Sequence, residues 1–259
     1  MSSIPIAVFG ALGRMGQRVI ALAGEHGCHL SGALVEPGDA RVGERQGEVE
    51  LTDKPMDAAR GARVVVDFAL VGGFAERVAA AAEAGAALVT GVTALSDKDF
   101  RSLEDATAKI PVLWAPNMSQ GVNALLDLVE RAARALPNFE LEVHELHHRH
   151  KADAPSGTAV ALARRLAEAR DQDPGEALSL CRERDPGARR SGEIGVVATR
   201  GGDTVGEHVV YLFGAGERIE IAHRATSRDI FVHGALRAAR FVDQKPAGRY
   251  TMAQVLEAR

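Results

Sequence analysis

Residues 4–16 of the chain are IPIAVFGALGRMG, and this stretch decides the fold. Its apolar start predicts a strand, and Arg14 to Ala23 predicts a helix. Gly10, Gly13 and Gly16 lie at the turn between them. Glycines at such a turn let backbone N–H groups approach a pyrophosphate, and the helix N-terminus adds partial positive charge. The stretch predicts a dinucleotide-binding domain, although a tight turn without a ligand is the alternative interpretation.

Strands and helices alternate through the first half of the chain. Further strands are predicted at residues 29–35, 63–68, 87–92 and 112–115. Helices are predicted at residues 73–84 and 96–109. Ser96 with Asp99 resembles a capping box at the start of the second of these helices. This alternation predicts right-handed crossovers and a mainly parallel, Rossmann-type sheet.

The pattern changes after Asn117, which predicts a second domain over residues 118–228. Helices are predicted at residues 121–136, at 157–170 and over the last 30 residues, including 231–242, and a strand is predicted at 139–145. Residues 171–192 are polar and contain prolines and glycines, which predicts a mobile loop. Residues 195–225 contain three strand-like runs separated by glycine turns, which predicts an antiparallel meander. The fold class is therefore α/β, with a parallel-sheet nucleotide-binding domain and an α+β domain that has an open sheet.

Composition narrows the class of protein. Of 259 residues, 46% are hydrophobic and only 4% aromatic, which favours helices packed on an aliphatic sheet. The net charge of −4 gives no sign of a nucleic-acid partner. Cys28 and Cys181 make no disulfide framework and fit a reducing cytosol. Without a signal peptide or a long apolar run, we expect a cytoplasmic protein that does not bind membranes.

Glu36 lies at the end of the second predicted strand, about 20 residues after Gly16. An acidic residue at this place commonly binds the adenosine ribose hydroxyls. Because its carboxylate repels a 2′-phosphate, Glu36 favours NADH over NADPH. A solvated loop glutamate is the alternative.

A basic cluster occupies residues 144–151: His144, His147, His148, Arg149, His150 and Lys151. Three interpretations compete. A metal site is one, but no spacing such as HExxH accompanies the histidines, so we expect no metal. A solvated basic loop is the second. The third is a site for anion binding and proton transfer, because imidazole titrates near neutral pH and lysine can donate a proton.

The residues after the cluster favour the third interpretation. Ser156 is a candidate N-cap, and the N–H groups of Gly157 and Thr158 at the helix start can bind a carboxylate. A cationic cluster beside such a helix start suits a small substrate with more than one carboxylate.

Several motifs together resemble one family. They are GALGRMG (10–16), VDF (66–68), GVT (91–93), APNMSQGVN (115–123), ELHHRHKADAPSGTA (145–159), GDTVGEH (202–208) and ERIEIAHRATSR (217–228). The chain resembles the 4-hydroxy-tetrahydrodipicolinate reductases, formerly called dihydrodipicolinate reductases, of lysine and diaminopimelate synthesis. The resemblance covers nearly the whole chain, and its most specific part is the histidine-rich run.

The resemblance implies a nucleotide-binding domain of residues 1–117 that is completed by 229–259. It also implies a substrate domain, 118–228, whose open sheet builds a homotetramer. His147 matches the proton donor or acceptor and Lys151 the proton-donating lysine. Matches to substrate contacts are His148, Gly157 and Thr158. The expected cofactor-binding residues are Gly10, Ala11, Leu12, Gly13, Arg14, Met15, Glu36, Gly91, Val92, Thr93, Ala115, Pro116, Asn117 and Met118. The implied reaction adds the cofactor hydride to ring carbon C4 after water is lost.

One position departs from the family pattern. Many members carry an arginine after the acidic residue, whereas this chain has Pro37. Arg41 or Lys54 can partly replace that cation, so NADPH stays possible and NADH is the expected preference. Two rivals share the glycine loop and Glu36: another Rossmann-type reductase such as an aspartate dehydrogenase, and a non-catalytic NAD-binding sensor. Neither needs the histidine-rich run.

Overall fold

The computed structural model describes residues 3–182 and 187–258. The chain divides into two compact units. The first consists of Met1–Gln120 with Asp229–Arg259, and the second of Gly121–Arg228. The C-terminal segment is thus part of the first unit, which no local sequence pattern indicates.

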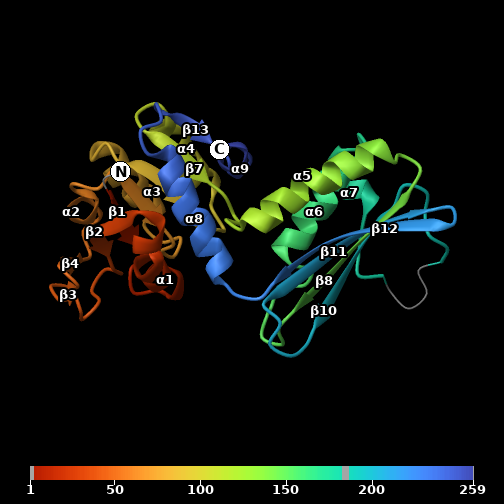
Figure 1. Cartoon of the computed structure of the whole chain (residues 1–259), viewed down its shortest axis with the longest axis horizontal. Coiled ribbons are helices and arrows are strands. Elements are labelled where there is room, and N and C mark those ends of the chain that lie inside the picture. The colour runs from red at the N-terminus through yellow and green to blue at the C-terminus, as the bar shows by residue number, and fades with distance from the viewer. Residues whose placement is uncertain (1–2, 183–186, 259) are drawn as a thin grey trace. The chain divides into compact units, whose positions relative to one another are not determined.

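The first unit contains a largely parallel sheet (Figure 1). Its strands in spatial order are β13 (Gly248–Tyr250), β7 (Pro111–Trp114), β6 (Ala87–Thr90), β5 (Val64–Asp67), β1 (Ile4–Phe9), β2 (Cys28–Leu34), β4 (Val49–Thr52) and β3 (Arg45–Gln46). Pairings from β13 to β4 are parallel, and β3 runs antiparallel to β4. The predicted Rossmann-type sheet is confirmed.

Helices cover both faces of this sheet. One face packs against α1 (Arg14–Leu22), α8 (Asp229–Val242) and α9 (Met252–Glu257), and the other against α2 (Pro55–Ala59), α3 (Phe74–Glu83) and α4 (Asp97–Thr107). Figure 1 shows α8, from the end of the chain, beside α1 from its beginning. The capping box of Ser96 and Asp99 is present at α4. The short elements β3, β4 and α2 were not predicted, because two to five residues carry too little periodicity. The helix predicted over the last 30 residues is wrong at β13, a strand that lies between α8 and α9.

The second unit contains a mixed sheet. Its strands in spatial order are β12 (Glu217–Ala225), β11 (Gly206–Gly214), β8 (Glu140–His147), β10 (Ile194–Arg200) and β9 (Leu178–Leu180). Helices α5 (Gln120–Ala135), α6 (Gly157–Glu168) and α7 (Pro174–Ala177) complete it, and α5 and α6 cover one face. The other face of the sheet carries the exposed side chain of Val197, which pairs with His144 on β8.

The predicted meander of residues 195–225 is wrong in its first strand. Strand β8 lies between β10 and β11, and β10 runs parallel to β8. Only β11 and β12 form the predicted antiparallel hairpin. Glycine spacing reports turns between strands, whereas the insertion of β8 depends on pairing with a distant segment.

The predicted mobile loop of residues 171–192 is also partly wrong. It contains α7 and β9, and β9 pairs in parallel with β10. Asp173 caps α7 by accepting a hydrogen bond from the Gly175 N–H. Polar composition hid these short elements, and residues 183–186 of the segment lie outside the described residues.

No helix among residues 3–182 and 187–258 is long and apolar enough to cross a membrane.

Candidate functional site

The glycine loop of the first unit is built for close backbone approach. Gly10 has φ +78°, and a Cβ there would lie 2.8 Å from the Cα of Ala69. A Cβ on Gly16 would lie 2.1 Å from the carbonyl oxygen of Gly10. Helix α1 begins after Gly13, and no described side chain caps its N-terminus. A pyrophosphate fits this loop, because the helix N–H groups stay available to it.

The carboxyl ends of β1, β2, β5, β6 and β7 lie along one edge of the sheet, because these strands are parallel. Backbone hydrogen bonds connect the loops that leave this edge: Ala11 N to Leu34 O at 2.9 Å, Phe68 N to Phe9 O at 3.1 Å, Gly91 N to Asp67 O at 3.0 Å, and Ala115 N to Thr90 O at 3.2 Å. The structure therefore brings residues 10–15, Glu36, 91–93 and 115–118 to a single edge of the first unit.

A buried ion pair supports the loop after β5. Asp67 is fully buried and accepts a hydrogen bond from Arg77 at 3.0 Å. Arg77 also donates to the carbonyl oxygens of Leu70 and Gly72, and Asp67 accepts from the Ala69 N–H at 2.8 Å. Burial raises the pKa of Asp67 above its usual range although Arg77 opposes this. The pair holds the loop that packs against Gly10, and no sequence pattern indicated it.

Cations near Glu36 bear on the choice of cofactor. Glu36 lies two residues after Leu34, which pairs with Thr52 on the neighbouring strand. Lys54 lies two residues after Thr52, so Glu36 and Lys54 follow the ends of two neighbouring strands. Arg41, in contrast, makes a two-point ion pair with Asp39, at 2.9 and 2.8 Å.

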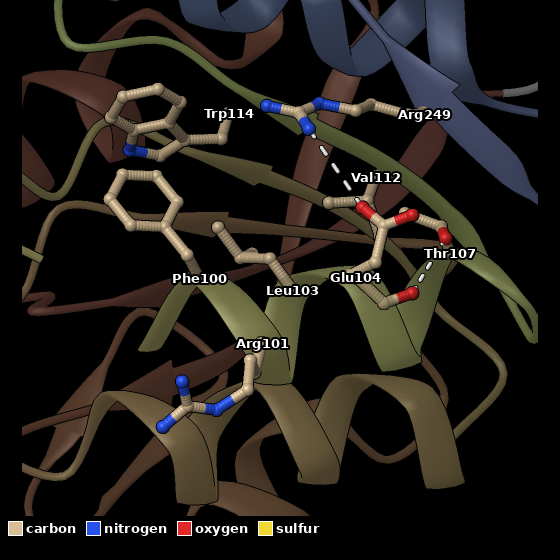
Figure 2. A pocket seen from close by; sticks show the side chains of 8 residues that line it. All are labelled: Phe100, Arg101, Leu103, Glu104, Thr107, Val112, Trp114 and Arg249. Carbon is tan, nitrogen blue, oxygen red and sulfur yellow. Dashed lines mark hydrogen bonds and ion pairs between the residues drawn. The ribbon is translucent and has the colours of Figure 1, made fainter. Parts of the chain in front are cut away.

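Trp114 ends β7 beside the segment Ala115–Met118. Its indole N–H donates to the carbonyl oxygen of Val92 at 2.8 Å, which joins two segments expected to line the nicotinamide. Its ring packs edge-to-face on Phe100, and both line the pocket in Figure 2. Glu104 and Arg249 also line this pocket and form an ion pair, with 3.8 Å between a carboxylate oxygen and a guanidinium nitrogen. No residue predicted for the site lines this pocket.

The second unit holds the histidine-rich stretch at the end of β8. Side chains of this strand alternate, and Leu141, Val143, Glu145 and His147 are buried. Leu141 and Val143 join the apolar core, and Glu145 and His147 continue the same face. A polar pair thus ends an apolar row.

Glu145 is the centre of a buried hydrogen-bond network. Its carboxylate accepts from the Nδ1 of His147, from two guanidinium nitrogens of Arg200 at 2.8 Å each, and from the Ser156 N–H at 3.0 Å. Arg200 also donates to the carbonyl oxygen of Asp153. On the other side, the His208 ring contacts His147 edge-to-face at 5.2 Å between centroids.

Protonation states in this network follow from burial and hydrogen bonding. Burial alone would raise the pKa of Glu145, but hydrogen bonds from Arg200, His147 and Ser156 outweigh it and lower the pKa. Burial, together with the nearby charge of His147, lowers the pKa of His208 to about 4. Near pH 7, Glu145 is therefore ionised and His208 neutral.

Of the remaining basic side chains, His144 is separated from the others, whereas His148 lies near His150 and Arg228. His144 lies on the opposite face of β8 from His147 and contacts Thr199 at 2.9 Å. His148 contacts Arg228 at 3.0 Å, and its pKa is lowered by partial desolvation and by that charge. Lys151 binds the carboxylate of Asp153 at 2.7 Å.

Ser156 caps α6 as predicted, since its hydroxyl accepts from the Ala159 N–H at 3.2 Å. Gly157 is exposed, and a Cβ there would meet nothing within 4 Å. The space beside Gly157 at the N-terminus of α6 is therefore large enough for an anion.

Sequence analysis assigned no role to four residues that the structure places around His147 and Lys151: Glu145, Arg200, His208 and Asp153. Glu145 had a usable signal: the alternation of LEVHELH places an acidic residue on the apolar face of the strand. No local sequence signal indicated Arg200 or His208, because the pairing of β10 and β11 with β8 brings them next to Glu145 and His147. Within the described residues, no three potential ligands are grouped to hold a metal ion.

Family models match both halves of the chain. The N-terminal model of dihydrodipicolinate reductase matches residues 4–118, and the C-terminal model matches residues 121–256. The chain belongs to the dihydrodipicolinate reductase family. It is therefore an NAD(P)H-dependent oxidoreductase of the kind that the motifs implied.

Similar proteins agree with this assignment. The 4-hydroxy-tetrahydrodipicolinate reductase of Anaeromyxobacter sp. (strain Fw109-5) is 45% identical over 98% of this chain and 97% of its own length. That of Chromohalobacter salexigens is 43% identical over 97% of each chain. The solved structure of dipicolinate-bound dihydrodipicolinate reductase from Paenisporosarcina sp. TG-14 has a TM-score of 0.78 at 21% identity, over 96% of this chain and 97% of that one. This last likeness concerns the fold.

Proposed function

We propose that this member of the dihydrodipicolinate reductase family reduces (2S,4S)-4-hydroxy-2,3,4,5-tetrahydrodipicolinate to 2,3,4,5-tetrahydrodipicolinate in lysine and diaminopimelate biosynthesis. The observation that carries the proposal is the buried Glu145–His147 pair, which is followed within one loop by Lys151 and the N-terminus of α6. A proton source and an anion-binding helix start are what reduction of a dicarboxylate imine needs.

The nucleotide, when bound, supplies the hydride to ring carbon C4. Its pyrophosphate is assigned to residues 10–15 and its adenosine ribose to Glu36. The nicotinamide is assigned to Gly91, Val92, Thr93 and to 115–118. This assignment follows from the edge of the sheet where all four segments lie.

Residues of the second unit handle the substrate. Hydride addition to a conjugated imine builds negative charge on the ring, and a cationic acid stabilises that charge and delivers a proton. His147 and Lys151 are assigned this role. Gly157 and Thr158 at the start of α6, with His148, are assigned to the substrate carboxylates, because N–H groups and cations bind carboxylates strongly.

NADH is the proposed preferred cofactor. Glu36 repels a 2′-phosphate, Pro37 supplies no cation, and Arg41 is paired with Asp39. Lys54 is the remaining candidate cation beside Glu36, so NADPH can still bind. Comparing kcat/KM for the two cofactors tests this, and a clear preference for NADPH would refute it.

The second unit is also proposed to assemble a homotetramer in the cytoplasm. The face of the mixed sheet that α5 and α6 leave open carries Val197, which is 41% exposed. Exposed apolar side chains on a sheet face suit contact with a second copy. Light scattering with Val197→Lys measures whether this face carries the assembly.

The activity is tested with substrate made freshly from pyruvate and aspartate semialdehyde, by following NADH absorbance. Lys151→Ala should lower kcat by about 10²–10⁴, the usual contribution of a positioned proton donor, while NADH affinity stays unchanged. The exposed Lys109→Ala is the control. Absence of NADH oxidation by the wild-type protein contradicts the proposed function.

A further inference from the structure

His147 is held between two features that together select one of its ring nitrogens. On one side, its Nδ1 contacts the carboxylate of Glu145. On the other, its Nε2 lies next to Gly206 at the start of β11, where a Cβ would come within 2.8 Å of that nitrogen. Glu145 lies on β8, the strand of His147 itself, whereas Gly206 begins β11.

We infer that Glu145 is a positioning residue, which fixes His147 in the Nδ1–H form so that Nε2, left uncovered by Gly206, is the atom that exchanges a proton. The inference rests on the proposed function for the identity of the proton acceptor. Which ring nitrogen of His147 is protonated does not depend on the proposed function.

The surroundings of the Glu145 carboxylate keep it in its ionised form. Glu145 is 1% exposed. Arg200 donates a hydrogen bond to each carboxylate oxygen, and the Ser156 N–H donates to one of them. Four donors around a carboxylate keep it ionised, and an ionised carboxylate only accepts hydrogen bonds. The Nδ1 of His147 must therefore carry a hydrogen, and Nε2 is the nitrogen that gains and loses a proton.

Strand register makes this arrangement rigid. Arg200 pairs with His147 across β10 and β8, and His208 pairs with Glu145 across β11 and β8. Because burial lowers the pKa of His208, this ring adds no second cation beside His147 near pH 7. Arg200 also binds the carbonyl oxygen of Asp153, whose carboxylate holds Lys151. One guanidinium thus orders both proposed proton donors.

Glu145→Gln tests the inference, because it keeps the shape of the side chain and removes its charge. The matched control is Glu142→Gln on the same strand. Glu142 also binds two arginines, Arg182 and Arg189, but it faces away from His147. We expect kcat to fall at least 100-fold in Glu145→Gln, with KM and NADH affinity within about threefold of wild type. Glu142→Gln should keep its kcat.

Nitrogen-15 NMR of histidine-labelled protein reads the ring state directly, with His147→Gln to assign the signal. In the wild-type protein at high pH, Nδ1 of His147 should be protonated and Nε2 bare. Glu145→Gln should give a mixture of the two forms. Gly206→Ala should lower kcat by covering Nε2 and leave the Nδ1–H form unchanged.

The outcomes separate the two proposals. A wild-type protein that is inactive but shows the Nδ1–H form refutes the proposed function and leaves the role of Glu145 standing. An Nε2–H form in the wild-type protein overturns the inference, and this measurement needs no variant to fold. Equal kcat in Glu145→Gln and Glu142→Gln overturns it as well.

Discussion

Gly16→Ala places a methyl group where the structure has no room for one. A Cβ at this position would lie 2.1 Å from the Gly10 carbonyl oxygen and 2.9 Å from the Cα of Ala11. Ordinary contact begins at 3.4 Å, so the methyl falls short by about 1.3 Å. Gly10 cannot retreat, because its N–H donates to Leu34 and its own Cβ side is closed by Ala69.

Helix propensity and packing predict opposite changes in stability for this substitution. Gly16 lies within α1, where alanine is favoured over glycine by about 1 kcal/mol. Overpacking against fixed backbone costs about 1–3 kcal/mol, so we expect a net loss of stability. A displaced N-terminus of α1 should also lose at least one charge-assisted hydrogen bond to the pyrophosphate. That loss is worth about 1.5–3 kcal/mol, or tenfold and more in NADH affinity.

Thermal unfolding and a fluorescence titration with NADH measure the two effects. The control is Gly24→Ala in the same unit, where a Cβ meets nothing within 4 Å, and it should change stability by less than about 0.5 kcal/mol. If Gly16→Ala unfolds at or above the wild-type temperature and binds NADH equally well, the steric reasoning is refuted.

Two further predictions concern buried charge. Arg77→Met leaves Asp67 buried without its cation, so urea unfolding should show a loss of about 3–5 kcal/mol, partly restored by adding Asp67→Asn; equal stability of the single and double variants contradicts this. The pKa of His208 is about 4 in the folded protein and about 6.5 when unfolded, so below pH 6.5 the unfolded state binds the proton first. Stability should therefore fall by up to about 1.4 kcal/mol per pH unit on acidification from 6.5 towards 4. His208→Gln should lack this share of the pH dependence, whereas the exposed His29→Gln should retain it.

The first unit of the protein was largely predictable from its sequence. Residues 4–16 carry their own strand, turn and helix, and the alternation that follows is a local pattern. Parallel pairing then necessarily gathers the carboxyl ends of the strands at one edge, so the sequence alone could place Glu36 and residues 91–93 there. Ser156 was predictable for the same reason, because an N-cap depends on the residues next to it.

The second unit was predictable only as a list of residues. The run from Glu145 to Thr158 determines which side chains are present, and local alternation determines that Glu145 and His147 share a buried face. Tertiary structure alone decided that β8 lies between β10 and β11. That placement brings Arg200, 55 residues away, to Glu145, and sets Gly206 against the Nε2 of His147. Pairing between distant strands depends on the packing of the whole unit, which no short window of sequence contains.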